Sequence, residues 1–313
     1  MLIFQLLNTK ISFVTMKIIN KIAKKINEGN IKKNLKVCVC TLAKLENRYI
    51  RQFVQHYEKY GVDKIFLYDN NDIDGENFEE VINDYIKKGF VEIMNWRGEN
   101  EAMRRIMNDC YIKNYKYYDW LIFYEIDEFI FLHDFKNIKL FLNQKKFNKC
   151  QEIYLNLVCH TDNNLLYYED KPLVERFPLT VPKTKIGGQK LEVKTIIRGH
   201  INGAKIMAIH LGDTRLKSCN NSGLHENISH YAIYPDQKKY YIDHYYSKST
   251  EEFINKITKG DALRNDVGYI HLRINKYFRQ NEITEEKLDM IERAARINLD
   301  KYRKQLNKFN ESN

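Results

Sequence analysis

Short apolar runs alternate with amphipathic segments through the first half of the chain. Runs of this length, rich in β-branched residues and bounded by polar ones, are typical of buried strands. The segments between them space their apolar residues three and four positions apart, and two end at glycines, Gly61 and Gly89, as helices often do. The predicted strands are LKVCVCTLA, VDKIFLYDNND, FVEIMNW and WLIFYEIDEFIFL.

Strands that alternate with helices predict βαβ units and therefore a mostly parallel central sheet flanked by helices. We expect an α/β fold of the Rossmann-like kind. Ligands bind such sheets outside the carboxyl ends of the strands. The polar strand ends DNND, residues 69–72, and EIDE, residues 125–128, should therefore approach one crevice.

The alternation fades in the second half, although no repeat or change of composition divides the chain. QEIYLNLVCH and AKIMAIHL are predicted strands, residues 161–190 a loop region, and residues 250–259 and 284–308 helices. The predicted organisation is a basic extension (1–35), one domain (36–262) with halves at 36–150 and 151–262, and a helical C-terminal segment (263–313).

Charge and cysteine usage narrow the class of protein. The net charge of +10 favours anionic partners such as nucleotides, nucleic acid or lipid headgroups. Nucleic acid is not expected, because the chain has no RNP-like, helix-turn-helix or zinc-finger signature and no single stripe of lysines. The six cysteines form no CxxC pair, which predicts reduced, buried thiols in a cytoplasmic protein.

The N-terminal region carries two open alternatives. Isoleucines at helical spacing lie between lysines in residues 17–33, which fits a helix on the inner face of an anionic membrane and equally a helix packed on the domain. No run approaches the 18 or so apolar residues of a membrane span, and no signal peptide is expected. Translation could begin at Met1 or at Met16.

The stretch EIDE sets three carboxylates in an apolar run. Strand alternation would place Glu125 and Asp127 on one side and Glu128 on the other. Two close carboxylates repel each other unless a cation lies between them. Mg²⁺ or Mn²⁺ would resolve this conflict, because such hard ions bind carboxylate and phosphate oxygens together. The alternative is that these acids cap the strand end and pair with surface lysines or arginines.

Further polar residues could belong to the same site. Lys194 and Arg198, in VKTIIR, are candidate phosphate partners, and DHYYSKS contributes His244 and Lys248. Asn71, in YDNND, has an amide of the kind that hydrogen-bonds a base or ribose.

Five ordered segments within residues 36–262 resemble an A-type (GT-A) glycosyltransferase of the family 2 and family 92 (DUF23-like) group. The resemblance implies a nucleotide-sugar-binding sheet joined to an elaborated acceptor half. It also implies an inverting transfer of a sugar of the hexose type, usually from a UDP-linked donor, to an acceptor hydroxyl. The segments are LENRYIRQFVQHYEKYGVDKIFLYDNNDID, WLIFYEIDEF, LVCHTDNNLLYYEDKPLVERF, VKTIIRG and DHYYSKSTEEFINKITKGDA.

The resemblance also implies site residues. EIDEF takes the place of the family's Asp-x-Asp motif, so Asp127 would bind the metal, with Glu125 in place of the usual first Asp and His244 as a third ligand. Glu46 and Asp69 lie where the family contacts the nucleotide, and Lys194 where a diphosphate partner would be useful.

An inverting transfer also needs a general base. Asp162, in HTDNN, is the first candidate, with Glu192 and Asp213 as rivals, and the alternative for Asp162 is a turn-capping role.

The expected function is synthesis of a surface glycan, such as lipopolysaccharide, capsule or glycoprotein sugar, on a glycan or glycolipid acceptor. Two other classes stay open: a nucleotidyltransferase or metal-dependent phosphohydrolase, which normally needs more clustered acids, and a nucleic-acid-binding protein. The C-terminal helix, with Leu288, Ile291, Ala295 and Leu299 near heptad spacing, is expected to pack on its own domain or to form a dimer contact.

Overall fold

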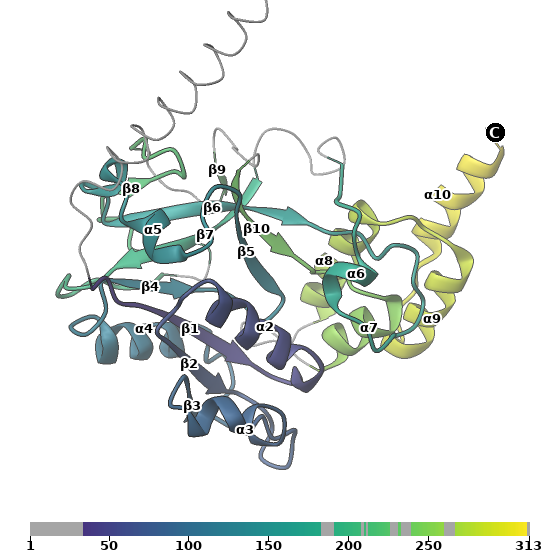
Figure 1. Cartoon of the computed structure of the whole chain (residues 1–313). Coiled ribbons are helices and arrows are strands. Elements are labelled where there is room, and N and C mark those ends of the chain that lie inside the picture. Colours follow the sequence, from purple (N-terminus) through teal and green to yellow (C-terminus); the bar gives the residue numbers. More distant parts are fainter. Residues whose placement is uncertain are drawn as a thin grey trace, which may run out of the picture.

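One curled sheet forms the centre of the protein. The computed structural model describes residues 34–182, 191–207, 210, 212–225, 231–232, 239–259 and 267–311. The strand order is β3-β2-β1-β4-β7-β6-β10-β5, with the short strands β8 and β9 paired to β6 and β7 (Figure 1). The basic N-terminal extension, including its expected helix, lies outside the described residues.

The first four strands are parallel and are joined by helices. β1 (Val37–Ala43) pairs with β2 (Lys64–Asp69) and β4 (Trp120–Phe123), and β2 pairs with β3 (Val91–Asn95). The connections are α2 (Asn47–Lys59), α3 (Glu79–Lys87) and α4 (Met103–Asn114). The predicted α/β fold, with a mostly parallel sheet flanked by helices, is confirmed.

Alternate residues of β1 belong to two separate cores. Val37 and Val39 pack in a cluster that includes buried residues of α2 and α3. Cys38 and Cys40 pack in a second cluster with buried residues of α4. This alternation is what the period of two in a strand requires when both faces of the sheet are covered.

The segment WLIFYEIDEFIFL forms two strands and not the single strand expected from its hydrophobicity. β4 ends at Phe123, and β5 (Glu128–Leu132) pairs antiparallel with β10 (Tyr240–His244). Between them the chain turns, with the Glu128 amide donating to the Glu125 carbonyl at 3.0 Å and the Glu125 amide to Glu128 Oε2 at 2.9 Å. The expectation that Glu128 points away from its neighbours is therefore wrong, because strand alternation does not apply inside a turn.

The second half of the sheet is mixed. β6 (Glu152–Cys159) is antiparallel to β7 (Leu191–Arg198) and parallel to β10, while β7 is antiparallel to β4. The strand predicted over AKIMAIHL is wrong for its described part, because residues 204–207 are irregular and the Ile206 amide donates to Asn108 Oδ1 on α4. The remaining elements are α5 (Ile138–Leu142), η1 (Lys145–Phe147), α6 (Leu173–Arg176), β8 (Ser218–Cys219) and β9 (Tyr231–Ala232).

Helices α7 to α10 gather at one end of the sheet around a core of their own (Figure 1). The single helix expected over residues 284–308 is divided, because Arg296 adopts a left-handed backbone conformation, φ 54°, where α9 ends. Leu288, Ile291 and Leu299 are buried in this core, so they pack on their own chain. The bounds are α7 (Thr250–Thr258), α8 (Val267–Gln280), α9 (Glu285–Ala295) and α10 (Asp300–Glu311).

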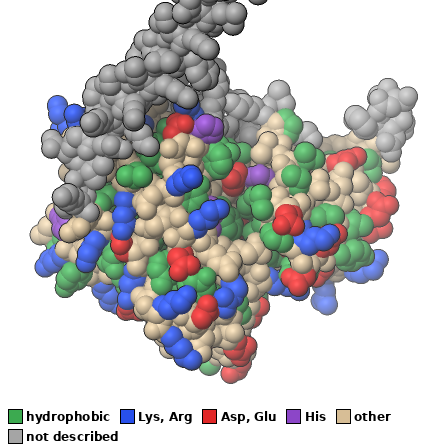
Figure 2. Space-filling model, viewed as in Figure 1, with side chains coloured by type: hydrophobic (Ala, Val, Ile, Leu, Met, Phe, Trp, Pro, Cys, Tyr) green, Lys and Arg blue, Asp and Glu red, His purple; other side chains and the backbone are tan. Residues whose placement is uncertain are grey.

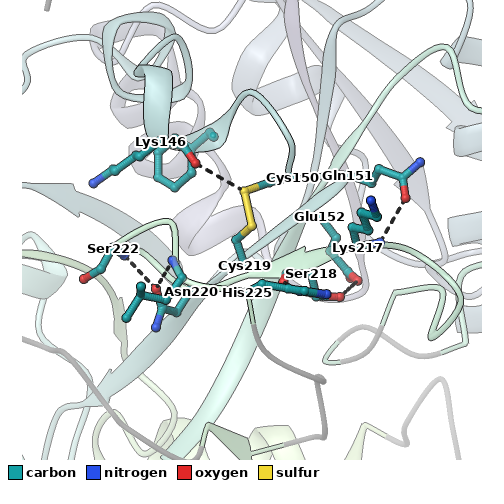
Figure 3. Close-up of a disulfide and its surroundings, with 12 residues drawn as sticks. Lys146, Cys150, Gln151, Glu152, Lys217, Ser218, Cys219, Asn220, Ser222 and His225 are labelled. Carbon is teal, nitrogen blue, oxygen red and sulfur yellow. Dashed lines mark hydrogen bonds between the residues drawn. A yellow bond between two sulfur atoms is a disulfide. The ribbon is translucent and has the colours of Figure 1, made fainter.

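Four of the six cysteines are paired, so the expectation of six reduced thiols is wrong. One disulfide joins Cys40 on β1 to Cys110 on α4, and the other joins Cys150 to Cys219 on β8 (Figure 3). The partners are 70 and 69 residues apart, a separation at which spacing in the sequence gives no pairing signal. Disulfides persist mainly in oxidising compartments. The cysteines therefore no longer support the cytoplasmic location, which stays a prediction.

Within the described residues, no helix combines the length and the apolar character that crossing a membrane requires. On the face shown in Figure 2, basic and acidic side chains are interspersed and do not gather into one patch.

Candidate active site

Three carboxylates and one imidazole meet where β4, β5 and β10 come together. Glu125, Asp127, Glu128 and His244 each offer one potential ligand atom, and these atoms lie within 4.8 Å of one another. We call them the acid–histidine group. The turn after β4 supplies Glu125 and Asp127, and antiparallel register places His244 on β10 directly opposite Glu128 on β5. Residues more than one hundred positions apart thus meet because β10 pairs with β5.

A buried lysine lies under this group. Lys194, on β7, places its ammonium 2.7 Å from Glu125 Oε2 and 2.9 Å from Glu128 Oε1. Its side chain is fully buried. An unpaired charge at such a position would be very unfavourable, so Lys194 is tied to these two carboxylates.

The two oxygens of Asp127 face different partners. Oδ1 lies 3.7 Å from His244 Nε2. Oδ2 lies 2.7 Å from the ammonium of Lys256 on α7 and 3.6 Å from that of Lys248, just before the helix. Lys248 is buried, with a left-handed backbone at φ 53°, a strained conformation of the kind that concentrates at functional sites.

Burial and these partners shift the protonation equilibria. Burial raises the pKa of Asp127, but the ammonium groups of Lys256 and Lys248 outweigh this effect and hold the pKa well below its usual value. Burial together with the charges of Glu125 and Asp127 raises the pKa of Glu128 to about 8 in spite of Lys194. Burial lowers the pKa of His244 to about 3. His244 is therefore neutral at physiological pH, the form in which imidazole binds metals.

The acid–histidine group fits a divalent cation. His244 Nδ1 is buried and has no hydrogen-bond partner within the described part of the chain. His244 Nε2 is 3.7 Å from Asp127 Oδ1 and 3.9 Å from Glu128 Oε1, beyond hydrogen-bonding distance. Ligands that each lie about 2.1 Å from one shared Mg²⁺ or Mn²⁺ would be roughly 3 to 4 Å apart. The donor set of carboxylates and one imidazole suits such an ion.

Two adjoining hollows open beside the acid–histidine group. The first, the strand-end hollow, measures about 90 Å³ and lies between the ends of β1, β2 and β4 and the start of α4. The second, the helix hollow, measures about 270 Å³ and lies between the start of α2 and α7. Glu46, Lys256 and Lys259 line both hollows, so these three side chains form the wall between them.

The model of glycosyltransferase family 92 matches residues 33–259. This range includes every member of the acid–histidine group and every residue that lines the two hollows except Arg273. The chain belongs to glycosyltransferase family 92.

Relatives carry the same family name. A family 92 protein of Oryza sativa is 30% identical over 97 residues, 30% of this chain and 16% of that protein. A family 92 protein of Ricinus communis is 24% identical over 128 residues, 40% of this chain and 22% of that protein. These matches take in less than a quarter of the relatives' own length.

Among solved structures, TarS of S. aureus, residues 1–349 in complex with UDP-GlcNAc, is similar with 10% identity and a TM-score of 0.41. The similarity covers 83% of this chain and 79% of that one. The assignment to the family rests on the family model alone.

The predicted nucleotide-binding residues of this family 92 protein fall into two kinds. Glu46 lines both hollows, where its Oε1 accepts from Lys259 at 2.7 Å and its Oε2 is buried without a hydrogen bond from the described residues. Asp69 and Asn71 are buried and bonded to each other, and Asn71 Oδ1 accepts from the Leu45 amide at 2.7 Å. Asp69 and Asn71 thus hold the loop after β1 in place from behind.

Two other predicted residues of this family 92 protein, Arg198 and Asp162, lie away from the acid–histidine group. Arg198 lies over the Trp120 ring at 4.2 Å and donates to the carbonyls of Cys150 and Phe147. Asp162 is buried, 2.7 Å from the ammonium of Lys287 on α9. Its carboxylate is held at the junction with the C-terminal helices.

The rival bases differ in position. Glu192 lies on β7 two residues before Lys194, and its carboxylate is 2.7 Å from the ammonium of Lys276 on α8. Burial raises the pKa of Glu192, but the ammonium of Lys276 outweighs this effect and the pKa falls to about 2. Asp213 is paired with Arg215, two positions further along the chain, and accepts from the Lys205 amide.

The sequence-based prediction missed three cations and one amide of the site. Lys256 on α7 and Lys259 at its C-cap lie three positions apart, so their helical spacing was a usable signal. Arg273 on α8 and Asn70 at the end of β2 both line the strand-end hollow. Nothing in the sequence places α8 against this hollow, because the contact depends on how the helices pack.

Proposed function

We propose that this family 92 transferase moves a sugar from a nucleoside diphosphate donor, uridine-linked as the resemblance implies, to a hydroxyl of a glycan acceptor. The transfer is inverting and depends on Mn²⁺ or Mg²⁺. The observation that carries the proposal is the acid–histidine group, flanked by Lys248 and Lys256, at the edge of hollows lined by strand ends. This arrangement at the carboxyl ends of parallel strands supports the GT-A type.

The residues of the site divide the work of binding and leaving-group stabilisation. Asp127, Glu128 and His244, with Glu125 at the rim, would hold the ion, which when bound supplies a Lewis acid for the diphosphate. Lys248 and Lys256 present ammonium groups beside Asp127 and bind phosphate oxygens. Glu46 accepts hydrogen bonds from the donor through its unsatisfied oxygen.

The base for the acceptor hydroxyl is better assigned to Glu192 than to Asp162. Glu192 and Lys194 are two positions apart on β7 and so project from the same face of the sheet, the face that carries the acid–histidine group. The carboxylate of Glu192 remains partly exposed, whereas Asp162 is enclosed by Lys287 and Tyr277. A base must reach the proton it takes.

The acceptor class follows from the resemblance alone. We propose a surface glycan or glycolipid, made at a membrane to which the basic N-terminal extension would bring the enzyme. A dimer contact of the C-terminal segment would use residues other than Leu288, Ile291 and Leu299, since these pack within the chain.

Thermal melting of the full chain with UDP, GDP, CMP and ADP, each with and without Mn²⁺, tests the donor and metal together. A ligand at 100 times its dissociation constant adds about 2.7 kcal/mol of stability if it binds only the folded state. We expect one nucleotide, UDP first, to raise the melting temperature only when Mn²⁺ is present, and Asp127→Asn to abolish the shift. Asp84→Asn, an exposed carboxylate on α3, is the control and should keep it. A wild-type melt that no nucleotide moves, with or without metal, would sink the proposal.

A further inference from the structure

The charges around Asp127 are balanced before any ligand is considered. Glu125 and Asp127 are ionised, whereas Glu128, with its pKa raised to about 8, is mostly protonated at neutral pH. These acids face three lysines: Lys194 contacts Glu125 and Glu128, and Lys248 and Lys256 contact Asp127. Neighbouring charges are paired with each other, Glu46 with Lys259 and Glu192 with Lys276. This part of the site therefore carries a small net charge, whether or not Glu128 keeps its proton.

Such a balance makes either half of the proposed ligand unfavourable alone. A bare divalent cation would add two positive charges within a few ångströms of three ammonium groups. A bare diphosphate would bring negative charge toward the carboxylates of Glu125 and Asp127. In a partly buried site these interactions are much stronger than in water. The cation and the diphosphate together nearly cancel.

Lys256 is the group that must respond when they enter. Its ammonium occupies Asp127 Oδ2 at 2.7 Å, and its side chain forms part of the wall between the two hollows. Neither hollow alone has the 300 Å³ or more of an ordinary ligand pocket. The Lys256 ammonium also lies 4.3 Å from the centre of the Tyr246 ring. Such a contact tolerates sideways movement better than a hydrogen bond does.

We propose that Lys256 couples metal binding to donor binding. Without donor, the Lys256 ammonium binds Asp127 Oδ2 and repels the cation. When the donor enters, this ammonium moves to a diphosphate oxygen. The movement of Lys256 joins the two hollows and leaves Asp127 Oδ2 available to the metal. The inference rests on the proposed function, because it requires a diphosphate donor and a metal at this site. By linkage, each ligand must then raise the affinity for the other by the same factor.

Lys259 provides a matched control on the same helix. It lies three residues beyond Lys256 and lines the same two hollows, but its ammonium binds the Lys44 carbonyl and Glu46 Oε1. Removing its charge should therefore leave the metal site unchanged.

Isothermal titration of the full chain measures the coupling directly. The ligands are Mn²⁺, the nucleoside diphosphate that stabilises most in the melting panel, and its nucleoside. In the wild type we expect the diphosphate to tighten Mn²⁺ binding by about tenfold or more, within the range usual for coupled sites. Lys256→Met should bind Mn²⁺ alone more tightly than the wild type, bind the diphosphate about tenfold more weakly and bind the nucleoside equally well. Lys259→Met should keep the wild-type affinity for Mn²⁺.

Contrary results distinguish a failure of the coupling role of Lys256 from a failure of the proposed function. If Lys256→Met binds Mn²⁺ alone no more tightly than the wild type, or loses nucleoside and diphosphate affinity equally, the coupling role is wrong. If Mn²⁺ and diphosphate bind the wild type independently, the role is also wrong while the donor proposal stands. A wild type that binds no nucleoside diphosphate with Mn²⁺ overturns the proposed function itself. Lys256→Gln, which keeps a polar end, repeats the test if the Met variant does not fold.

Discussion

A buried aspartate is defined by the partners that surround it. Asp127 divides its oxygens between His244 and two lysines beside open hollows, whereas Asp162 is enclosed. Tyr277 and Lys287, from α8 and α9, both contact the Asp162 carboxylate, and the Asp162 amide donates to Asn281. The same side chain thus serves a candidate reaction centre in one place and helix docking in the other.

We expect Asp162→Asn to destabilise the fold by roughly 3 to 5 kcal/mol, because it leaves the ammonium of Lys287 buried without its counter-charge. Urea unfolding measures the loss, and nucleotide binding should persist in the fraction that stays folded. Asp84→Asn, which breaks only the exposed pair with Arg51, should cost less than about 1 kcal/mol. Wild-type stability combined with lost sugar transfer would instead restore Asp162 as the base.

Glu152, beside the disulfide shown in Figure 3, should make stability depend on pH. Burial raises its pKa from 4.5 to about 7, although a hydrogen bond from Ser218 opposes this shift. Below pH 4.5 the carboxyl is protonated in both states, and between pH 4.5 and 7 only the unfolded chain releases the proton. Stability therefore falls as pH rises through this window, by about 3 kcal/mol in total.

Urea unfolding at a series of pH values checks this expectation. Glu152→Gln should remove that part of the pH dependence and be more stable than the wild type above pH 7, because it has no proton to release. An unchanged slope in the Gln variant would show that another group titrates.

The site could be predicted from sequence only where its residues are close together along the chain or match a motif. Glu125 and Asp127 were found as an acid pair, and His244 through the resemblance, and the structure brings all three together. Glu128 was placed on the wrong side because the turn was not foreseen. Lys256 was missed because its contact with Asp127 depends on the packing of α7.

At the scale of elements, prediction succeeded where structure is local. The first three strands of the parallel half, β1, β2 and β3, are each followed by a helix, so period and end signals lie within about 30 residues, the length of a βαβ unit. The mixed half is built from distant pairings, such as β10 with β5 and β7 with β4, which one sequence does not reveal. β7 and β10 were accordingly missed as strands, although residues from both reach the site.

The disulfides link different elements of the fold, such as β1 and α4, and labelling of the free thiols measures how many form. Alkylation of the unfolded, unreduced protein should label two of the six cysteines, Cys38 and Cys159. Reduction should lower stability by about 4 kcal/mol per bridge, the chain-entropy value for loops of this length. Cys38→Ala is the control: one label disappears, and reduction should still lower stability as it does in the wild type. Six labelled cysteines would show that neither bridge forms.

For the whole molecule, the C-terminal segment is bound to the domain that precedes it. The core of α8, α9 and α10 includes buried residues of α7, such as Phe253, which stacks on Tyr277 with ring centroids 4.2 Å apart. Asn164 Oδ1 also accepts from Lys287 at 2.8 Å. The boundary predicted at residue 262 therefore divides the sequence at a place where the packing continues.

Truncation after residue 262 should give a protein that does not fold cooperatively, because it exposes the core around Phe253 and leaves Asp162 without its partners. Truncation after residue 299 removes only α10 and should be milder. Circular dichroism melts of both proteins make the comparison. A sharp, wild-type-like melt of the shorter protein would show that residues 36–262 form an independent domain.

The order of the cysteines along the chain bears on how the protein can be made. Cys40 finds its partner, Cys110, as the next cysteine to be synthesised, whereas Cys150 is followed by Cys159 long before Cys219. Closing a short loop costs less entropy than closing a long one. An oxidant that acts during synthesis would therefore promote the first bridge and trap the second as a wrong link to Cys159. Production should thus keep the chain reduced until it is complete and oxidise it only after the second half has folded.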